Sequence, residues 1–483
     1  MATEFTYDEL YEDEEGGFRD SIATVDEKGK RIWLYPKKPK GAFYNKRLLA
    51  TLAFLAIFIS GPFIKIGGQP LLMMNIFERK FVIFGRLFLP QDFVLFGLGM
   101  ITFVVFIALF TATFGRIWCG WLCPQTVFME MIFRPIENWL EGDGRKQQKF
   151  DQKKWDFDKA WRKTLKHAIF IVFSIFIAHI TMAYLIGIEN VKELITSPPS
   201  EKWAGFIGLV VFTGAFYFVF AKLREQVCIA ICPYGRLQGV LVNKDTVNVM
   251  YDDKRGEPRG RISKNATEEE LSAQGDCIDC KLCIQVCPTG IDIRNGVQLE
   301  CVNCTACIDA CDDVMEKVNK PKGLIRYASL ESVEKGVPFK LPIRSWAYSA
   351  VLLLLIGIET AFLMARADIE TTVMRVPGQL YQKTDRGTIT NLYNAQMVNK
   401  SQEEMNLKLA LDGDISENWT LNVVGANEDG LINLKPEAKT EVVFFIEMPE
   451  GDVKQRSTEL KLRVLDGEEE VENVKTNFFG PAK

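Results

Sequence analysis

The chain has 483 residues, enough for several domains, and a formal net charge of −4. It lacks the basic footprint of a nucleic-acid-binding protein, so we expect no nucleic-acid partner. Its twelve cysteines all fall in short-spaced motifs, which is typical of metal and redox sites and not of a disulfide framework.

The first thirty residues are acidic and interrupted by glycine, which predicts a disordered tail and no signal peptide. Five later stretches are long and apolar enough to cross a bilayer as helices of about 20 residues. They cover residues 48–66, 93–114, 165–186, 203–221 and 346–365. A soluble protein with buried helices is the alternative, but it does not explain the charge pattern of the loops.

Lys and Arg are distributed unevenly among these loops. Residues 115–164 are rich in both, whereas residues 187–202 contain only Lys192 and Lys202. Because short cytoplasmic loops carry the excess of positive charge, we expect the N-terminus and residues 115–164 and 222–344 in the cytoplasm. An odd number of spans then places the chain after residue 366 in the periplasm of a bacterial inner-membrane protein.

A C-x-x-x-C-P motif follows the second and the fourth apolar stretch. The cysteines are Cys119 and Cys123 in the first motif, and Cys228 and Cys232 in the second. If helical, this spacing places both sulfurs of a motif on one helix face, although the proline disfavours a continuous helix. The repeat predicts a duplicated helical hairpin that gathers four soft thiols suited to Cu(I), zinc or iron–sulfur chemistry. The alternative is that they are small buried residues at helix ends.

The remaining eight cysteines form two consecutive C-x-x-C-x-x-C-x-x-x-C runs, here called the cassette. This is the pattern of two-cluster bacterial ferredoxins, in which the fourth cysteine of each run binds the other cluster. Zinc is the alternative for C-x-x-C pairs, but it does not explain the doubled order. The expected ligands are Cys277, Cys280, Cys283 and Cys311 for one 4Fe–4S cluster, and Cys301, Cys304, Cys307 and Cys287 for the other. Pro288 follows the first run, whereas Asp312 takes that place after the second.

After residue 376 the sequence alternates between apolar and polar residues in short runs separated by turn signals such as Asp-Gly. This pattern predicts an antiparallel β-sandwich. The tail contains neither Cys nor His, so we expect it to bind a partner. The predicted organisation is a partly disordered cytoplasmic tail (1–46), four membrane helices (47–222), a cytoplasmic ferredoxin-like domain (223–344), a fifth membrane helix (345–366) and a periplasmic β domain (367–483).

With these motifs in place, the chain resembles the CcoG/FixG/RdxA family of cytochrome c oxidase accessory proteins over nearly its whole length. The resemblance implies an immunoglobulin-like fold for the tail and reduction of Cu(II) to Cu(I) for assembly of the copper centre of cbb-type oxidase. It assigns the eight cassette cysteines to the clusters, and Cys119, Cys123, Cys228 and Cys232 to copper or electron relay. Membrane lipid, copper-delivery proteins, oxidase assembly factors and an unidentified electron donor are the implied partners, with a homodimer as one possible assembly.

Two other functions fit the same motifs. One is quinol-linked delivery of electrons to a periplasmic reductase, since related membrane subunits share both cysteine patterns. The other is a non-enzymatic redox sensor. No Gly-rich dinucleotide loop is present, so direct binding of NAD(P)H is not expected.

The doubled cassette predicts about eight irons and eight acid-labile sulfides per chain after anaerobic purification, from two four-iron clusters. Cys280→Ala and Cys304→Ala each remove one cluster ligand and should each lower the iron content by about half. Metal and sulfide analysis checks this prediction, and stoichiometric zinc with little iron would contradict it.

The loop charges predict that a reporter enzyme active only outside the cytoplasm works when fused after Lys483 and is silent when fused at Asn265. Activity of the two fusions in intact cells measures the orientation. The reverse pattern would show that the predicted number of spans is wrong by one.

Overall fold

The computed structural model describes residues 24–25, 28, 30–76, 79–88, 92–261, 273–378, 380–384, 387–401, 403–412, 419–425, 427, 430–436, 438–453 and 455–481. Most of the tail expected to be disordered lies outside these residues, as do Asn265 and Lys483. The chain divides into two compact units, residues 1–64 with 96–358 and residues 65–95 with 359–483.

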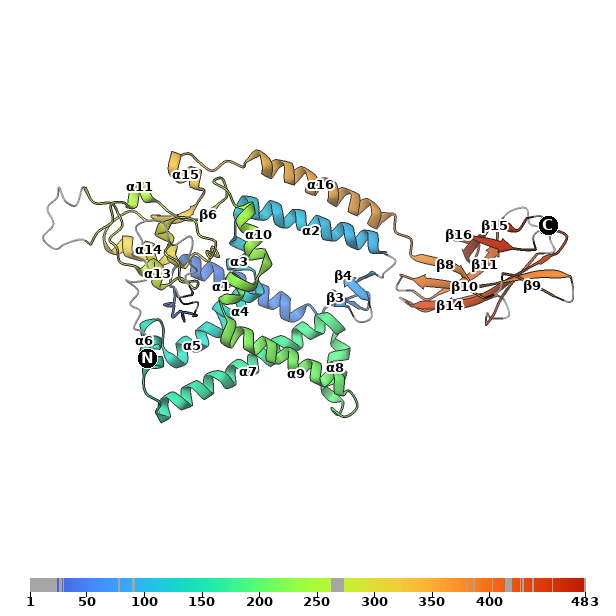
Figure 1. Cartoon of the computed structure of the whole chain (residues 1–483), viewed down its shortest axis with the longest axis horizontal. Coiled ribbons are helices and arrows are strands. Elements are labelled where there is room, and N and C mark those ends of the chain that lie inside the picture. Colours follow the sequence, from blue (N-terminus) through green and yellow to red (C-terminus); the bar gives the residue numbers. More distant parts are fainter. Residues whose placement is uncertain are drawn as a thin grey trace. The chain divides into compact units, whose positions relative to one another are not determined.

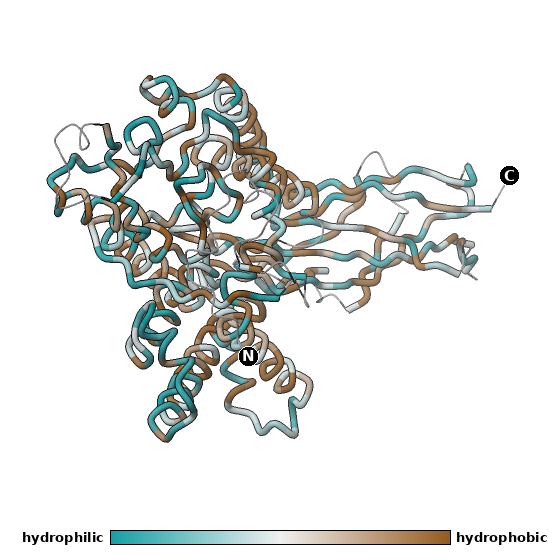
Figure 2. The backbone as a smooth tube through the Cα atoms, turned by 60° about the vertical axis from the view of Figure 1, so that its left-hand side comes forward, coloured by the Kyte–Doolittle hydropathy of each residue, from teal (hydrophilic) through white to brown (hydrophobic). Residues whose placement is uncertain are grey.

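Among the residues described, five helical segments are long and apolar enough to cross a membrane (Figures 1 and 2). They are α1 (Ala42–Ser60), α2 (Phe93–Phe114), α7 (Phe157–Ile186), Trp203–Leu223 and α16 (Ile343–Met364). The fourth combines α9 (Trp203–Phe218) with a π-helical turn over Val219–Leu223. These segments match the five predicted spans, with differences at their ends.

The first span is the largest of these differences. We expected it to reach residue 66, but α1 ends at Ser60, and Lys65–Ile66 forms strand β1 paired with β2 (Gln69–Pro70). Pro62 cannot donate a helical hydrogen bond, and Gly67 and Gly68 adopt the positive φ of a tight turn. The apolar composition of residues 61–66 therefore does not extend the helix.

Shorter elements of the first unit carry the cysteine motifs. The helices are α3 (Ile117–Trp121), α4 (Pro124–Phe128), α5 (Arg134–Glu141), α6 (Arg145–Gln152), α8 (Ile188–Thr196), α10 (Pro233–Leu241), α11 (Asp253–Gly256), α13 (Leu282–Gln285), α14 (Ala306–Lys317) and α15 (Leu330–Lys335). Strands β6 (Asn248–Tyr251) and β7 (Ile325–Ala328) pair antiparallel at the two ends of the cassette.

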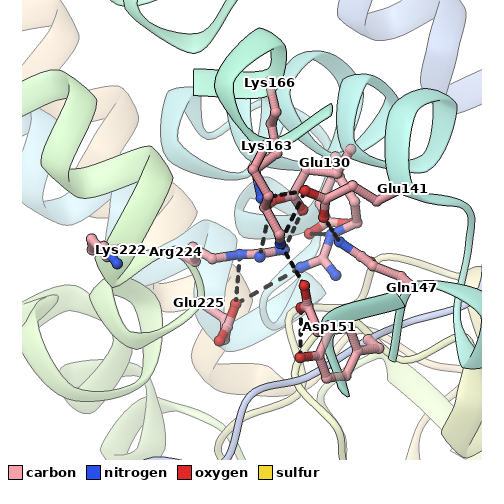
Figure 3. A network of polar contacts seen from close by, with 12 residues as sticks. Glu130, Glu141, Gln147, Asp151, Lys163, Lys166, Lys222, Arg224 and Glu225 are labelled. Atoms are coloured by element: carbon pink, nitrogen blue, oxygen red, sulfur yellow. Dashed lines mark hydrogen bonds and ion pairs between the residues drawn. The ribbon is translucent and has the colours of Figure 1, made fainter. Parts of the chain in front are cut away.

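A buried network of charges joins α5 and α7 to the residues that precede the second C-x-x-x-C-P motif (Figure 3). Arg224, 2% exposed, lies 2.9 Å from the Glu137 carboxylate, and Lys166 lies 2.9 Å from Glu141. The basic members are Arg31, Arg134, Lys163, Lys166 and Arg224, and the acidic members are Glu130, Glu137, Glu141, Asp151 and Glu225. Loss of one partner from such a network leaves an uncompensated buried charge, at a cost of about 3–5 kcal/mol.

The described residues of the second unit after Glu359 form two antiparallel sheets. One has the order β12-β14-β10-β8, with β9 also paired to β10, and the other has the order β13-β11-β15-β16. Buried Tyr393, Phe444 and Phe478 belong to one core cluster drawn from both sheets. The predicted β-sandwich is confirmed, with strands β8 (Ile369–Arg375), β9 (Gln382–Lys383), β10 (Thr388–Asn399), β11 (Met405–Leu411), β12 (Thr420–Val423), β13 (Leu431–Leu434), β14 (Lys439–Pro449), β15 (Ser457–Asp466) and β16 (Glu469–Phe479).

The segment between the first two spans also belongs to this unit, a feature that the sequence analysis did not anticipate. It forms a three-stranded sheet of β3 (Leu72–Asn75), β4 (Lys80–Ile83) and β5 (Arg86–Phe88). Asp92, which follows these strands, accepts hydrogen bonds from Arg366 at 2.7 Å and from Lys400 at 2.7 Å. These ion pairs join two regions of the second unit that are far apart in the sequence.

Candidate functional site

The two cysteine runs of the cassette adopt the same backbone conformation. In each run, the residues on either side of the middle cysteine have a positive φ: Asp279 and Lys281 around Cys280, and Asn303 and Thr305 around Cys304. A β-branched residue such as Thr305 rarely adopts this conformation, which costs of order 1–3 kcal/mol and concentrates at functional sites. In both runs, this strained backbone conformation wraps the loop around the first three cysteines of that run.

The two expected ligand sets line two different cavities. Cys277, Cys280, Cys283 and Cys311 line one of them. Cys287, Cys301, Cys304 and Cys307 line the other, with Cys283 between the two. Helices α13 and α14 pack against each other, so each run contributes its fourth cysteine to the cavity of the other run.

The lining of both cavities fits a 4Fe–4S cluster better than a single ion. Among the described residues, no three His, Cys, Asp or Glu side chains converge on one point where they could hold a metal ion. Each cysteine of a cubane binds a different iron, so its ligands surround a volume instead of converging on a point. Four thiols around a largely apolar cavity match that donor set.

Burial raises the pKa of the Cys301 thiol to about 12 and that of Cys304 to about 11. The positive charges of Arg116 and Arg47 act in the opposite direction on the pKa values of Cys301 and Cys304, respectively. Binding of iron requires thiolates, so it must displace protons from this site.

The departure at Asp312 has a structural counterpart. Helix α13 ends before Cys287 and Pro288, whereas α14 continues through Cys311 and Asp312 to Lys317. The Asp312 carboxylate accepts a hydrogen bond from the Gly323 backbone N–H at 2.9 Å. Asp312 therefore permits a continuous helix and anchors the strand that follows.

The C-x-x-x-C-P motifs do not present their two sulfurs on one helix face, as a continuous helix would. Cys119 lies in α3 and Cys228 in a π-helical turn over Val227–Ile231, whereas Cys123 and Cys232 are extended residues that precede α4 and α10. The proline after each second cysteine occupies the first position of a new helix, which needs no backbone N–H. The helix is therefore interrupted within both motifs.

Side chains around both motifs hold them together. Gln125 donates to the Arg224 carbonyl at 3.2 Å, the Tyr234 and Thr111 hydroxyls lie 2.8 Å apart, and the Gln238 amide donates to Cys119 Sγ at 3.5 Å. Burial raises the pKa of the Cys228 thiol to about 12, and the nearby sulfurs of Cys123 and Cys119 add to this rise. The four thiols are therefore neighbours, although they do not converge on a site for a single ion.

The first motif packs directly against the second cassette run. Cys119 and Cys304 belong to the same buried cluster. A Cβ atom at Gly120 would lie 2.4 Å from the Val302 carbonyl oxygen and 2.9 Å from the Asn303 backbone, so only glycine fits here. Trp121 donates to the Tyr327 hydroxyl at 3.1 Å, and that hydroxyl donates to the Asn303 carbonyl at 3.2 Å.

Asp309, located between Cys307 and Cys311, joins the cassette to the first membrane helix. Its buried carboxylate accepts hydrogen bonds from the backbone N–H groups of Phe43 at 3.0 Å and Tyr44 at 2.7 Å, at the start of α1. Helix N-termini lack internal partners for these groups and favour negative charge. The sequence analysis did not identify this contact, since nothing in residues 41–44 indicates a cap supplied by a distant residue.

Gly120→Val should separate the first motif from the cassette, because the new side chain overlaps the backbone beside Cys304. We expect the iron content to fall by up to about half, from loss of the second cluster. Gly214→Ala, where a Cβ atom meets nothing within 4 Å, is the matched control and should retain full iron. Unchanged iron and cluster spectra in Gly120→Val would contradict the close contact.

Comparison with known proteins agrees with these sites. A 4Fe–4S dicluster model matches residues 223–330, a 4Fe–4S binding-domain model matches residues 96–144, and a model of the Ig-like fold at the C-terminus of FixG, described as an oxidoreductase, matches residues 360–481. A crystal structure of a FixG-related protein from Vibrio parahaemolyticus aligns with 24% of this chain and 97% of its own, at 16% identity and a TM-score of 0.20.

Two curated relatives cover most of the chain. Protein RdxA of Cereibacter sphaeroides is 32% identical over 84% of this chain and 89% of its own length. The nitrogen fixation protein FixG of Rhizobium meliloti is 29% identical over 87% of each chain. The protein is therefore an iron–sulfur electron-transfer protein that belongs to the FixG/RdxA family.

Proposed function

We propose that this protein reduces Cu(II) to Cu(I) at the four C-x-x-x-C-P thiols, for assembly of the copper centre of a cbb-type cytochrome oxidase. The observation that carries this proposal is the position of Cys119, which shares a buried cluster with the cassette ligand Cys304. Electron transfer falls steeply with distance, so a substrate held by these thiols would lie where the cassette can reduce it.

The chemistry of the thiols favours the reduced ion. Thiolate sulfur is soft and selects Cu(I), whereas the harder Cu(II) ion prefers nitrogen and oxygen ligands. The sulfurs of buried Cys119 and of partly buried Cys123, Cys228 and Cys232 would therefore stabilise the product of a one-electron reduction. Since the four thiols do not converge on one point, binding would use a pair of them or a small movement of the motifs.

The reaction requires one electron for each copper ion. The eight cassette cysteines would hold two clusters, which would supply electrons one at a time, as the change from Cu(II) to Cu(I) requires. A reductant outside this chain must then restore the electron. From the loop charges, we propose that the cassette and the thiols face the cytoplasm and that the β-sandwich faces the periplasm. In the periplasm, the sandwich would contact copper-delivery or assembly proteins.

The test is the double variant Cys119→Ala with Cys228→Ala, which removes one thiol from each motif. Protein reduced with dithionite and freed of excess reductant is mixed anaerobically with a Cu(II) salt, and Cu(I) is measured with a colorimetric chelator. We expect the rate to fall at least tenfold, because the substrate has lost half of its soft ligands, while iron content stays near that of the wild type.

Two controls make the result specific. Ser174→Ala, a conservative substitution at a buried position of α7 that belongs to neither motif, should keep the wild-type rate. Ferricyanide, an acceptor that needs no thiol ligand, should be reduced equally well by the double variant. If the double variant still reduces copper and keeps its full iron content, the four thiols have only a structural role at the helix ends.

A further inference from the structure

Two buried arginines from the membrane part of the first unit lie beside the second ligand set. Arg116, 7% exposed, lines a cavity together with Cys301 and donates to the backbone carbonyl of Leu299. Arg47, on α1 and 3% exposed, lines a cavity together with Pro288, next to Cys287, and Ala306, next to Cys307.

Neither arginine has a carboxylate partner among the residues that the structure describes. Nη2 of Arg47 and Nε of Arg116 are buried without a hydrogen-bond partner. Glu130 lines the same cavity as Arg47, but its carboxylate lies 3.0 Å from Arg134. The second ligand set therefore lies beside two positive charges that the protein does not neutralise through an ion pair.

The charged side chains beside the first ligand set are, in contrast, mostly carboxylates. Arg294 lines the cavity of Cys277, Cys280, Cys283 and Cys311, but its guanidinium pairs with Asp279 at 2.5 Å and with Asp292 at 2.6 Å. Asp312, directly after Cys311, adds a further carboxylate. Lys281 also lines this cavity, so the two cations Arg294 and Lys281 stand against the three carboxylates of Asp279, Asp292 and Asp312, a net negative charge.

We propose that Arg47 and Arg116 make the site of Cys287, Cys301, Cys304 and Cys307 the more easily reduced of the two. Reduction adds one negative charge to the four thiolates and the iron that they bind, and an unneutralised positive charge in a buried environment stabilises that state. The net negative charge beside the first site disfavours the same change. The two arginines are positioning residues for the electron, because they bind neither iron nor substrate.

This inference deepens the proposed function. The favoured site is the one that packs against Cys119, so the arginines would hold the electron next to the thiols that bind copper. Both arginines come from segments outside the cassette: Arg47 from the first membrane helix and Arg116 from the residues that lead into the first motif. An isolated cassette would lack this bias.

The test is a redox titration of the full-length, cluster-loaded protein, followed by electron paramagnetic resonance. Arg47→Gln and Arg116→Gln should each lower the higher of the two midpoint potentials. We expect the equilibrium constant for electron transfer between the two sites to change about tenfold, which corresponds to about 59 mV for one electron. Arg47→Lys, which keeps the charge, should restore most of the wild-type value.

Arg294→Gln is the matched variant at the other site. It leaves Asp279 and Asp292 without their cation, so it should lower the lower midpoint potential and leave the higher one unchanged. Iron analysis verifies that each variant is loaded. If Arg47→Gln fails to load, Arg116→Gln and Arg294→Gln still assign the two potentials.

The proposal is overturned if the loaded Arg47 and Arg116 variants leave both potentials unchanged, or if they shift the lower one. It is also overturned if Arg294→Gln shifts the higher one. Because potentials are measured without copper, the proposed copper reduction can fail while this order of potentials holds, and the reverse can also occur.

Discussion

The close approach of Gly120 to the backbone of Val302 and Asn303 is the contact on which the redox architecture depends. It brings a membrane-proximal cysteine motif against the cassette loop that carries Cys304, with no side chain between the two backbones. Any larger residue would separate the thiols of the motif from the second ligand set. Since electron transfer weakens steeply with distance, that separation would slow any electron transfer between the cassette and these thiols.

Polar contacts between distant segments keep this interface in register. The Asp309 carboxylate caps α1 from within the cassette, and the buried charges around Arg224 position the second motif against the first. Buried ion pairs contribute little net stability, yet loss of one partner is costly. Loss of one of these partners would therefore disturb the packing that brings Arg47 and Arg116 to the second site.

Most of the architecture could be predicted because its signals are local. Apolar length predicted the five membrane-spanning candidates, and alternation predicted the β-sandwich. The errors arose where a local signal was incomplete. The end of α1 was such an error, because it depends on Pro62 and on two glycines with positive φ. The proline of each C-x-x-x-C-P motif, by contrast, indicated the interruption that the structure has, where a new helix starts. The strands between residues 65 and 88 were missed because they are short and irregular.

The chemistry could be predicted from the residues alone: eight cysteines in a doubled order for two clusters, four more thiols in the C-x-x-x-C-P motifs, and a tail without Cys or His. Spacing along the chain is sufficient for this, because a ferredoxin loop takes three of its ligands from one short segment. The packing of Cys119 against the second ligand set, and the burial of Arg47 and Arg116 beside that set, are visible only in the folded chain. Contacts such as Gly120 with Val302, or Asp309 with Tyr44, join residues more than 180 positions apart, so a local sequence pattern cannot predict them.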